Sequence, residues 1–269
     1  MKKTILIIGV IIVAAGLFFI FFTRTEEPIE NQNINIKVNS PAPNEVVKSQ
    51  LQLTGEVRTW YFEGSFPVKI LDANGKVLGN SYVMAQGDWM TTNFVAFKGE
   101  IDFTPSKTET GKIVFMKDNP SGLAEHDESF ELPIKFDMTT GTQILKIYFN
   151  NNNLDPQISC NKVFPVEREV YKTDAPARRA LELLLKGPAQ DEINSGYLTS
   201  INSGVKIQSI TIQNNVAKVD FDEQLENAVG GSCRVSAIRA QITETLKQFS
   251  SVKSVIISIN GRTEDILQP

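Results

Sequence analysis

The chain of 269 residues carries 27 basic and 31 acidic side chains, a formal net charge of −4 at pH 7, and 41 % hydrophobic residues. Three basic residues precede position 25 and every acidic residue follows it, so the rest of the chain has a net charge of about −7. This charge excludes the basic footprint of a nucleic-acid-binding protein, and the length favours two hydrophobic cores.

The first 24 residues predict a membrane anchor. Lys2 and Lys3 precede an uncharged apolar run from Ile5 to Phe22, which as a helix spans roughly 27 Å, close to the thickness of the hydrocarbon core of a bilayer. The lysines mark the cytoplasmic end, so residues 25–269 are expected outside the cytoplasm of a single-pass protein. The alternative is a cleaved secretory signal, which is disfavoured because the small residues 14–16 interrupt the run instead of ending it.

Residues 33–138 predict an all-β domain that follows a polar, acidic tether at residues 25–32. Apolar and polar residues alternate in Ile34–Val38, Phe66–Ile70 and Phe130–Phe136, which is typical of half-buried strands. The pair Asn74-Gly75 predicts a two-residue hairpin turn. About seven short strands separated by turn signals favour an immunoglobulin-like sandwich.

Residues 142–269 predict an α/β domain, which makes the fold class α+β overall. Asp174 and Ser232 are expected to cap two helices, the first ending at Gly187-Pro188 and the second exposing Gln241 and Lys247. Strands are expected around these helices, at residues 144–149, 163–170, 205–212, 216–221 and 252–259. The order strand, strand, helix, strand, strand, helix, strand describes helices packed on one small mixed sheet.

Both exported segments resemble domains of known bacterial families. Residues 142–266 resemble the GerM-type (GerMN) sporulation and germination domain, through Leu183–Pro188, Glu192, Gly196-Tyr197, Val216–Phe221, Thr245–Phe249 and Asn260-Gly261. Residues 34–137 resemble the immunoglobulin-like domain of bacterial spore germination proteins (the Gmad type), through Ser40–Asn44, Trp60–Phe66, Trp89-Met90 and Lys117–Gly122. The resemblance implies non-catalytic envelope modules, with the GerM-type domain similar to ring-building folds of envelope-spanning assemblies. It does not imply sporulation, because such domains also occur in bacteria that form no spores.

The two cysteines, Cys160 and Cys233, predict a disulfide. They are the only cysteines of the chain, and both are expected on the oxidising side of the membrane, where pairing is the default. Closing their loop would contribute roughly 4 kcal/mol at most. The alternative is a reactive thiolate at Cys233, near the start of a helix.

No residue is assigned to catalysis, cofactor binding or metal binding. The single His126 lies in an acidic loop and is expected to be solvated, and Asp220 and Asp222 are expected to be structural. A calcium site has suitable oxygen ligands but no fixed loop spacing, in Asp118, Asn119, Asp127 and Glu128. An acid/base pair assembled from distant carboxylates stays open.

Consecutive aromatic residues suggest a binding surface in the first domain. Trp60, Tyr61 and Phe62 cannot all face one core from a strand, so at least one is expected at the surface. Beside Glu63, an exposed ring could stack on a sugar or anchor a protein; the alternative is a buried strand. The stretch 118–122 is most simply a turn. The candidate surface therefore comprises Trp60, Tyr61, Glu63, Asp118 and Asn119.

Together these features predict a non-enzymatic, membrane-anchored envelope protein whose exported modules act in assembly. The expected partners are envelope proteins or further copies of the chain, and no cofactor is expected. The alternative is a protein that binds peptidoglycan or another envelope glycan. A third, weaker alternative is an enzyme accessory subunit or an unrecognised hydrolase.

Overall fold

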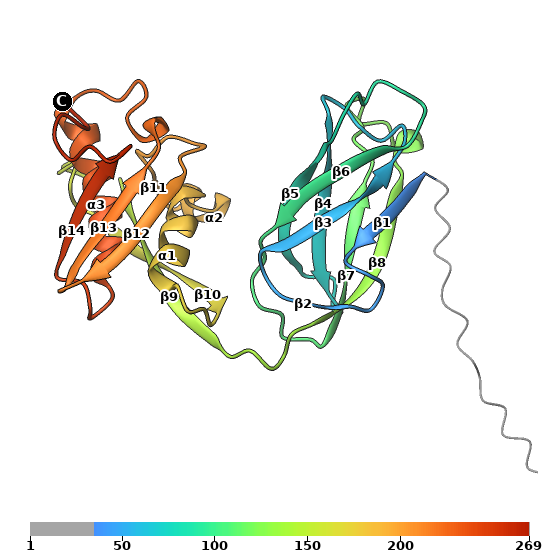
Figure 1. Cartoon of the computed structure of the whole chain (residues 1–269), viewed down its shortest axis with the longest axis horizontal. Helices are drawn as coiled ribbons and strands as arrows, with labels where there is room; N and C mark the ends of the chain where they lie inside the picture. The colour runs from blue at the N-terminus through green and yellow to red at the C-terminus, as the bar shows by residue number, and fades with distance from the viewer. Residues whose placement is uncertain (1–34, 269) are drawn as a thin grey trace, which may run out of the picture. The chain divides into compact units, whose positions relative to one another are not determined.

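The structure is a computed structural model that describes residues 35–268 (Figure 1). The predicted anchor at residues 1–24 and the tether at residues 25–32 lie outside the described residues. Within residues 35–268, no helix has the length and apolarity needed to cross a bilayer.

Residues 36–136, called the β-region below, form one continuous eight-stranded sheet. Its hydrogen-bonded order is β1-β3-β6-β5-β4-β7-β8-β2, in which all neighbouring pairs are antiparallel except β2 and β8. A short 3-10 helix, η1 (Ala124–His126), precedes the last strand. The strands are β1 (Ile36–Ser40), β2 (Val46–Val47), β3 (Leu51–Val57), β4 (Ser65–Asp72), β5 (Val77–Ala85), β6 (Val95–Ile101), β7 (Thr110–Met116) and β8 (Ser129–Phe136).

The sheet of the β-region folds over a shared core. The ring of Phe97 on β6 lies 5.3 Å from that of Phe66 on β4 and 5.8 Å from that of Phe115 on β7. Because β6 pairs with neither β4 nor β7, these contacts join the two layers of a sandwich, and Figure 1 shows β3 and β6 passing in front of β4 and β7. A hairpin turn joins β4 and β5 as predicted, but its loop has three residues, 73–75, instead of two: Asp72 donates its backbone N–H to the carbonyl of Lys76, and Gly75 donates its N–H to the carbonyl of Asp72. The arrangement is consistent with the expected immunoglobulin-like sandwich.

Residues 142–267, called the α/β-region below, contain two three-stranded sheets instead of the single mixed sheet that the sequence suggested. One sheet has the order β10-β9-β11 and the other β12-β13-β14, with β14 parallel to β13. The elements are β9 (Thr142–Asn151), β10 (Phe164–Tyr171), α1 (Pro176–Leu185), α2 (Gln190–Asn194), β11 (Tyr197–Leu198), β12 (Ile207–Gln213), β13 (Val216–Phe221), η2 (Glu223–Leu225), α3 (Ser232–Lys247) and β14 (Ser254–Ile259).

Two helices join these sheets into one core. Both α1 and α3 contact β9, and they also reach the second sheet, α1 at β12 and α3 at β14. Their apolar faces share one buried cluster with residues of both sheets, including Phe149, Leu181, Phe221 and Ile242. The sheets are therefore separate in hydrogen bonding but continuous in packing.

The expected caps of both helices are wrong by one residue. The cap positions are Ala175 and Gly231, and neither makes a side-chain capping bond. Pro176 takes the first position of α1, where a fixed φ and a missing N–H are tolerated. The predicted end of α1 is confirmed, because Gly187 adopts φ +78° and donates its N–H to Leu184.

Candidate functional site

The structure separates the three consecutive aromatic residues of the candidate surface. Trp60 is fully buried and packs against the ring of Phe66 at 5.9 Å, so its assignment to an exposed surface is wrong. Tyr61 donates its hydroxyl to the carbonyl of Val95 at 3.1 Å, and burial raises its pKa. Phe62 is 42 % exposed, which confirms that at least one ring reaches the surface.

The segments that carry Trp60 and Asp118 are neighbours. The backbone N–H of Asp118 donates to the carbonyl of Trp60 at 3.1 Å. Asn119 uses its amide to hold its own loop, donating to the carbonyl of Leu123 and to Asp127, both at 2.8 Å. The turn interpretation of this stretch therefore accounts for Asn119. Of the candidate surface, Glu63 is exposed, next to the exposed Phe62, and Tyr61, Asp118 and Asn119 are half-buried.

The other polar candidates have structural partners. Asp220 accepts hydrogen bonds from the hydroxyl of Ser258 at 2.6 Å and from the backbone of Gly261 at 2.9 Å. Asp222 accepts one from the backbone of Lys206 at 3.0 Å. His126 is exposed in η1. Among residues 35–268, no three metal-ligating side chains gather in one place.

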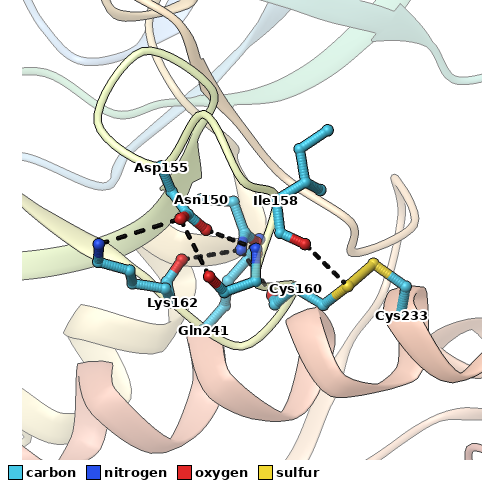
Figure 2. Close-up of a disulfide and its surroundings, with 8 residues drawn as sticks. Asn150, Asp155, Ile158, Cys160, Lys162, Cys233 and Gln241 are labelled. Atoms are coloured by element: carbon cyan, nitrogen blue, oxygen red, sulfur yellow. Dashed lines mark hydrogen bonds and ion pairs between the residues drawn. A yellow bond between two sulfur atoms is a disulfide. The ribbon is translucent and has the colours of Figure 1, made fainter.

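The predicted disulfide between Cys160 and Cys233 is present in the structure (Figure 2). It ties the loop between β9 and β10 to the first turn of α3. Asn150 supports this loop from the end of β9, because its amide donates to the carbonyls of Cys160 at 2.8 Å and Lys162 at 3.0 Å. The reactive-thiolate alternative for Cys233 is therefore wrong.

Polar side chains of α3 pair with β9, which the sequence analysis missed. Gln241 was expected at the surface but is fully buried, and its amide donates to the side-chain oxygen of Asn150 at 2.7 Å. Thr245 accepts the N–H of Tyr148 at 3.1 Å. One turn further on, Gln248 accepts the N–H of Lys146 at 2.9 Å and donates to its carbonyl at 2.7 Å.

These contacts cover the edge of β9 that faces away from β10. The three side chains, called the α3 polar stripe below, are Gln241, Thr245 and Gln248. Strand β11 pairs with β9 only at Asn150 and Asn151, so the stripe supplies partners where no strand does. Their spacing of four and three residues is the one signal in the sequence that places them on one face of the helix.

An acidic side chain of the β-region, Asp102, pairs with the cationic face of α1. Its carboxylate accepts hydrogen bonds from Ser49, from Lys186 and, at 2.5 Å, from Arg179. Both Asp102 and Arg179 are about nine-tenths buried. Burial raises the pKa of Asp102, but the hydrogen bonds from Arg179, Lys186 and Ser49 outweigh it, so the pKa lies below its ordinary value. The sequence did not reveal this cluster, because Asp102, Ser49 and α1 lie on separate segments of the chain.

Comparison with known families accounts for both regions. The family described as "Sporulation and spore germination" matches residues 146–265, and the family described as "Immunoglobulin-like domain of bacterial spore germination" matches residues 35–124. No curated protein matches the chain.

Solved structures give a weaker likeness. The tandem GerMN domains of the sporulation protein GerM from Bacillus subtilis are 24 % identical over 47 % of this chain and 42 % of that one, with a TM-score of 0.38. The first GerMN domain of the same protein is 22 % identical over 47 % of this chain and 92 % of that one, with a TM-score of 0.35. These values are too low to carry any statement about function, and the chain spans less than half of the tandem protein.

The two family matches agree with the resemblance noted in the sequence, on separate stretches of the chain. The chain therefore contains a GerM-type germination domain and, before it, an immunoglobulin-like domain of the bacterial spore germination type.

Proposed function

We propose that the protein is a membrane-anchored, extracytoplasmic and non-catalytic interaction module of the bacterial envelope. The observation that carries this proposal is the combination of two germination-type domains in one chain. The disulfide between Cys160 and Cys233 supports an oxidising compartment. The apolar run from Ile5 to Phe22 supports attachment to the membrane.

Attachment to a membrane favours assembly through weak lateral contacts. Copies held in one plane have a raised effective concentration, so a contact too weak to persist in dilute solution is populated there. Each region offers apolar side chains for such contacts. Tyr82 and Met84 project from the same face of β5 and are 58 % and 50 % exposed, and Ile256 on β14 is 40 % exposed.

Photo-crosslinking in cells tests this proposal while the disulfide stays intact. A photoreactive amino acid replaces Tyr82, Ile256 or the exposed Lys247, one position at a time, in the full membrane-attached chain. The residue Asn74, which is also exposed, lies in a hairpin loop and serves as the control. We expect a discrete crosslinked product, either with a second copy or with one recurrent envelope protein, at one or more test positions and not at Asn74.

Absence of crosslinks at every position would contradict the assembly proposal. The same full chain is then mixed with purified cell wall and sedimented. Co-sedimentation together with absent crosslinks would replace assembly by glycan binding as the function of the protein.

A further inference from the structure

A cavity of about 590 Å³ opens beside the start of α1. Its wall contains residues from the beginning of β9, the end of β10, the segment before α1, and the link between β2 and β3. Two acidic side chains, Asp174 and Glu182, lie in this wall. Four basic side chains outnumber them, namely Lys48, Lys172, Arg178 and Arg179. The cavity is therefore locally cationic in a chain whose net charge is negative.

Three buried donors in this wall lack hydrogen-bond partners among the described residues, on Arg179, Gln143 and Tyr171. Arg179 is 8 % exposed, and only its Nη2 reaches Asp102, at 2.5 Å. Its Nη1 has no hydrogen bond, because the nearest carboxylate oxygen, Oε2 of Glu182, is 3.7 Å away. The buried Nε2 of Gln143 on β9 is also unpaired.

Unpaired buried donors are costly, especially on a charged group. A ligand that accepts hydrogen bonds from the donors of Arg179 and Gln143 therefore gains more binding free energy than it would at an exposed site. The hydroxyl of Tyr171 also lines the cavity and has no hydrogen-bond partner among the described residues, so it can supply a third donor to the same ligand.

The start of α1 adds to the attraction for anions. This helix has ten residues, begins with a proline, and has no side-chain capping bond at Ala175. Backbone N–H groups at such an end carry partial positive charge. Thr173, Asp174 and Ala175 at this end line the cavity together with Arg178.

We propose that this cavity binds an oxyanion, the carboxylate or phosphate group of a polar ligand, through Nη1 of Arg179 and Nε2 of Gln143. A guanidinium suits this role because its planar donors match the oxygens of either group. The exposed Lys48 and Lys172 attract the ligand at the open side of the cavity. The site does not depend on whether the protein acts in assembly.

Glu182 is the internal competitor of the ligand. Its carboxylate already accepts a hydrogen bond from Gln50 at 2.9 Å and pairs with Arg178 at 3.2 Å. Because Nη1 of Arg179 is shielded from water, the oxyanion reaches it when Glu182 moves aside. Removing the negative charge at this position is therefore expected to strengthen binding.

Titration calorimetry of the purified full chain in detergent, at constant ionic strength, tests the site. The probes are inorganic phosphate and N-acetylglycine, which represent a phosphate and a carboxylate source. We expect one or both to bind, and the tighter probe identifies the source. Arg179→Gln and Gln143→Leu should each weaken binding about tenfold or more, because each removes a buried donor. Glu182→Gln should tighten it.

The matched control is Lys253→Gln, which removes one exposed positive charge outside the cavity and should leave affinity unchanged. Gln143→Leu removes no charge and no existing hydrogen bond, so it tests the site even if Arg179→Gln fails to fold. The proposal is overturned if neither probe binds. It is also overturned if binding is the same in Gln143→Leu and Lys253→Gln as in the unchanged chain.

Discussion

Asp102 shows how one buried carboxylate can join residues that are distant in sequence. It receives hydrogen bonds from Ser49, Arg179 and Lys186, which come from the link before β3, from the first half of α1 and from the residue that follows α1. An isolated buried charge would be unstable, so each partner depends on the others. Removing one of them leaves an uncompensated charge.

We expect Asp102→Asn to lower the free energy of unfolding by roughly 3 kcal/mol at neutral pH. The pKa of Asp102 is lowered in the folded chain from an ordinary value of 3.8, so the carboxylate stabilises the fold above that value. This contribution is lost as the pH falls through the folded-state pKa. Urea unfolding of the full chain at about pH 7 and about pH 3 measures the difference between the variant and the unchanged protein.

The difference should be large at the higher pH and should shrink at the lower one. Asp118→Asn, at a half-buried loop position, is the control and should change stability by less than about 0.5 kcal/mol. A destabilisation by Asp102→Asn that stays constant over the whole pH range would show that packing, and not charge, is responsible.

At the scale of elements, α3 acts on β9 much as a neighbouring strand would. The α3 polar stripe satisfies backbone groups of Lys146 and Tyr148 that have no strand partner. A buried N–H that loses its acceptor costs about 1–3 kcal/mol. The helix is therefore held on the sheet by directional bonds as well as by apolar contact.

Thr245→Val tests this arrangement because it keeps the shape of the side chain and removes only the acceptor for Tyr148. We expect a loss of about 1–3 kcal/mol in the free energy of unfolding and faster amide hydrogen exchange at Tyr148. Thr243→Val on the same helix is the control, since Thr243 is half-exposed and lines the outer side of α3. Equal exchange at Tyr148 in both variants would contradict a role for the stripe.

Short sequence signals correctly located the turns and helix ends whose conformation depends on one or two residues. The position of the turn between β4 and β5 and the helix end at Gly187 were predicted correctly, because Gly75 and Gly187 adopt a positive φ that glycine tolerates. The division into two sheets was not predicted, since it depends on β14 pairing with β13 across the whole of α3. The short α2 lacks the length that gives a periodic signal.

For the candidate sites too, the sequence revealed what depends on local or compositional signals and missed what depends on distant packing. The disulfide followed from cysteine count and compartment, whereas the burial of Trp60 and Gln241 depends on distant packing. Three consecutive aromatic residues do not reveal which of them turns inward. Asp102 and its partners Ser49, Arg179 and Lys186 lie on three separate segments, so no spacing in the sequence could reveal that cluster.

At the scale of the whole molecule, the most direct prediction from the sequence concerns membrane topology. We expect protease added to intact spheroplasts to digest residues 25–269, because the charge pattern around Ile5–Phe22 predicts that they lie outside the cytoplasm. Immunoblotting of the membrane fraction measures the loss of the full-length band. A cytoplasmic protein serves as the control and should stay intact; full protection of the chain would contradict the predicted topology.

The α3 polar stripe also has a consequence for how neighbouring chains can meet. Exposed strand edges recruit strands from other molecules and promote aggregation or domain swapping, a particular hazard for proteins crowded on one surface. Along the stretch of β9 that includes Lys146 and Tyr148, the side chains of α3 occupy the groups that an incoming strand would need. A second chain cannot extend the sheet there unless α3 first leaves, so the helix protects the protein against strand exchange at this edge.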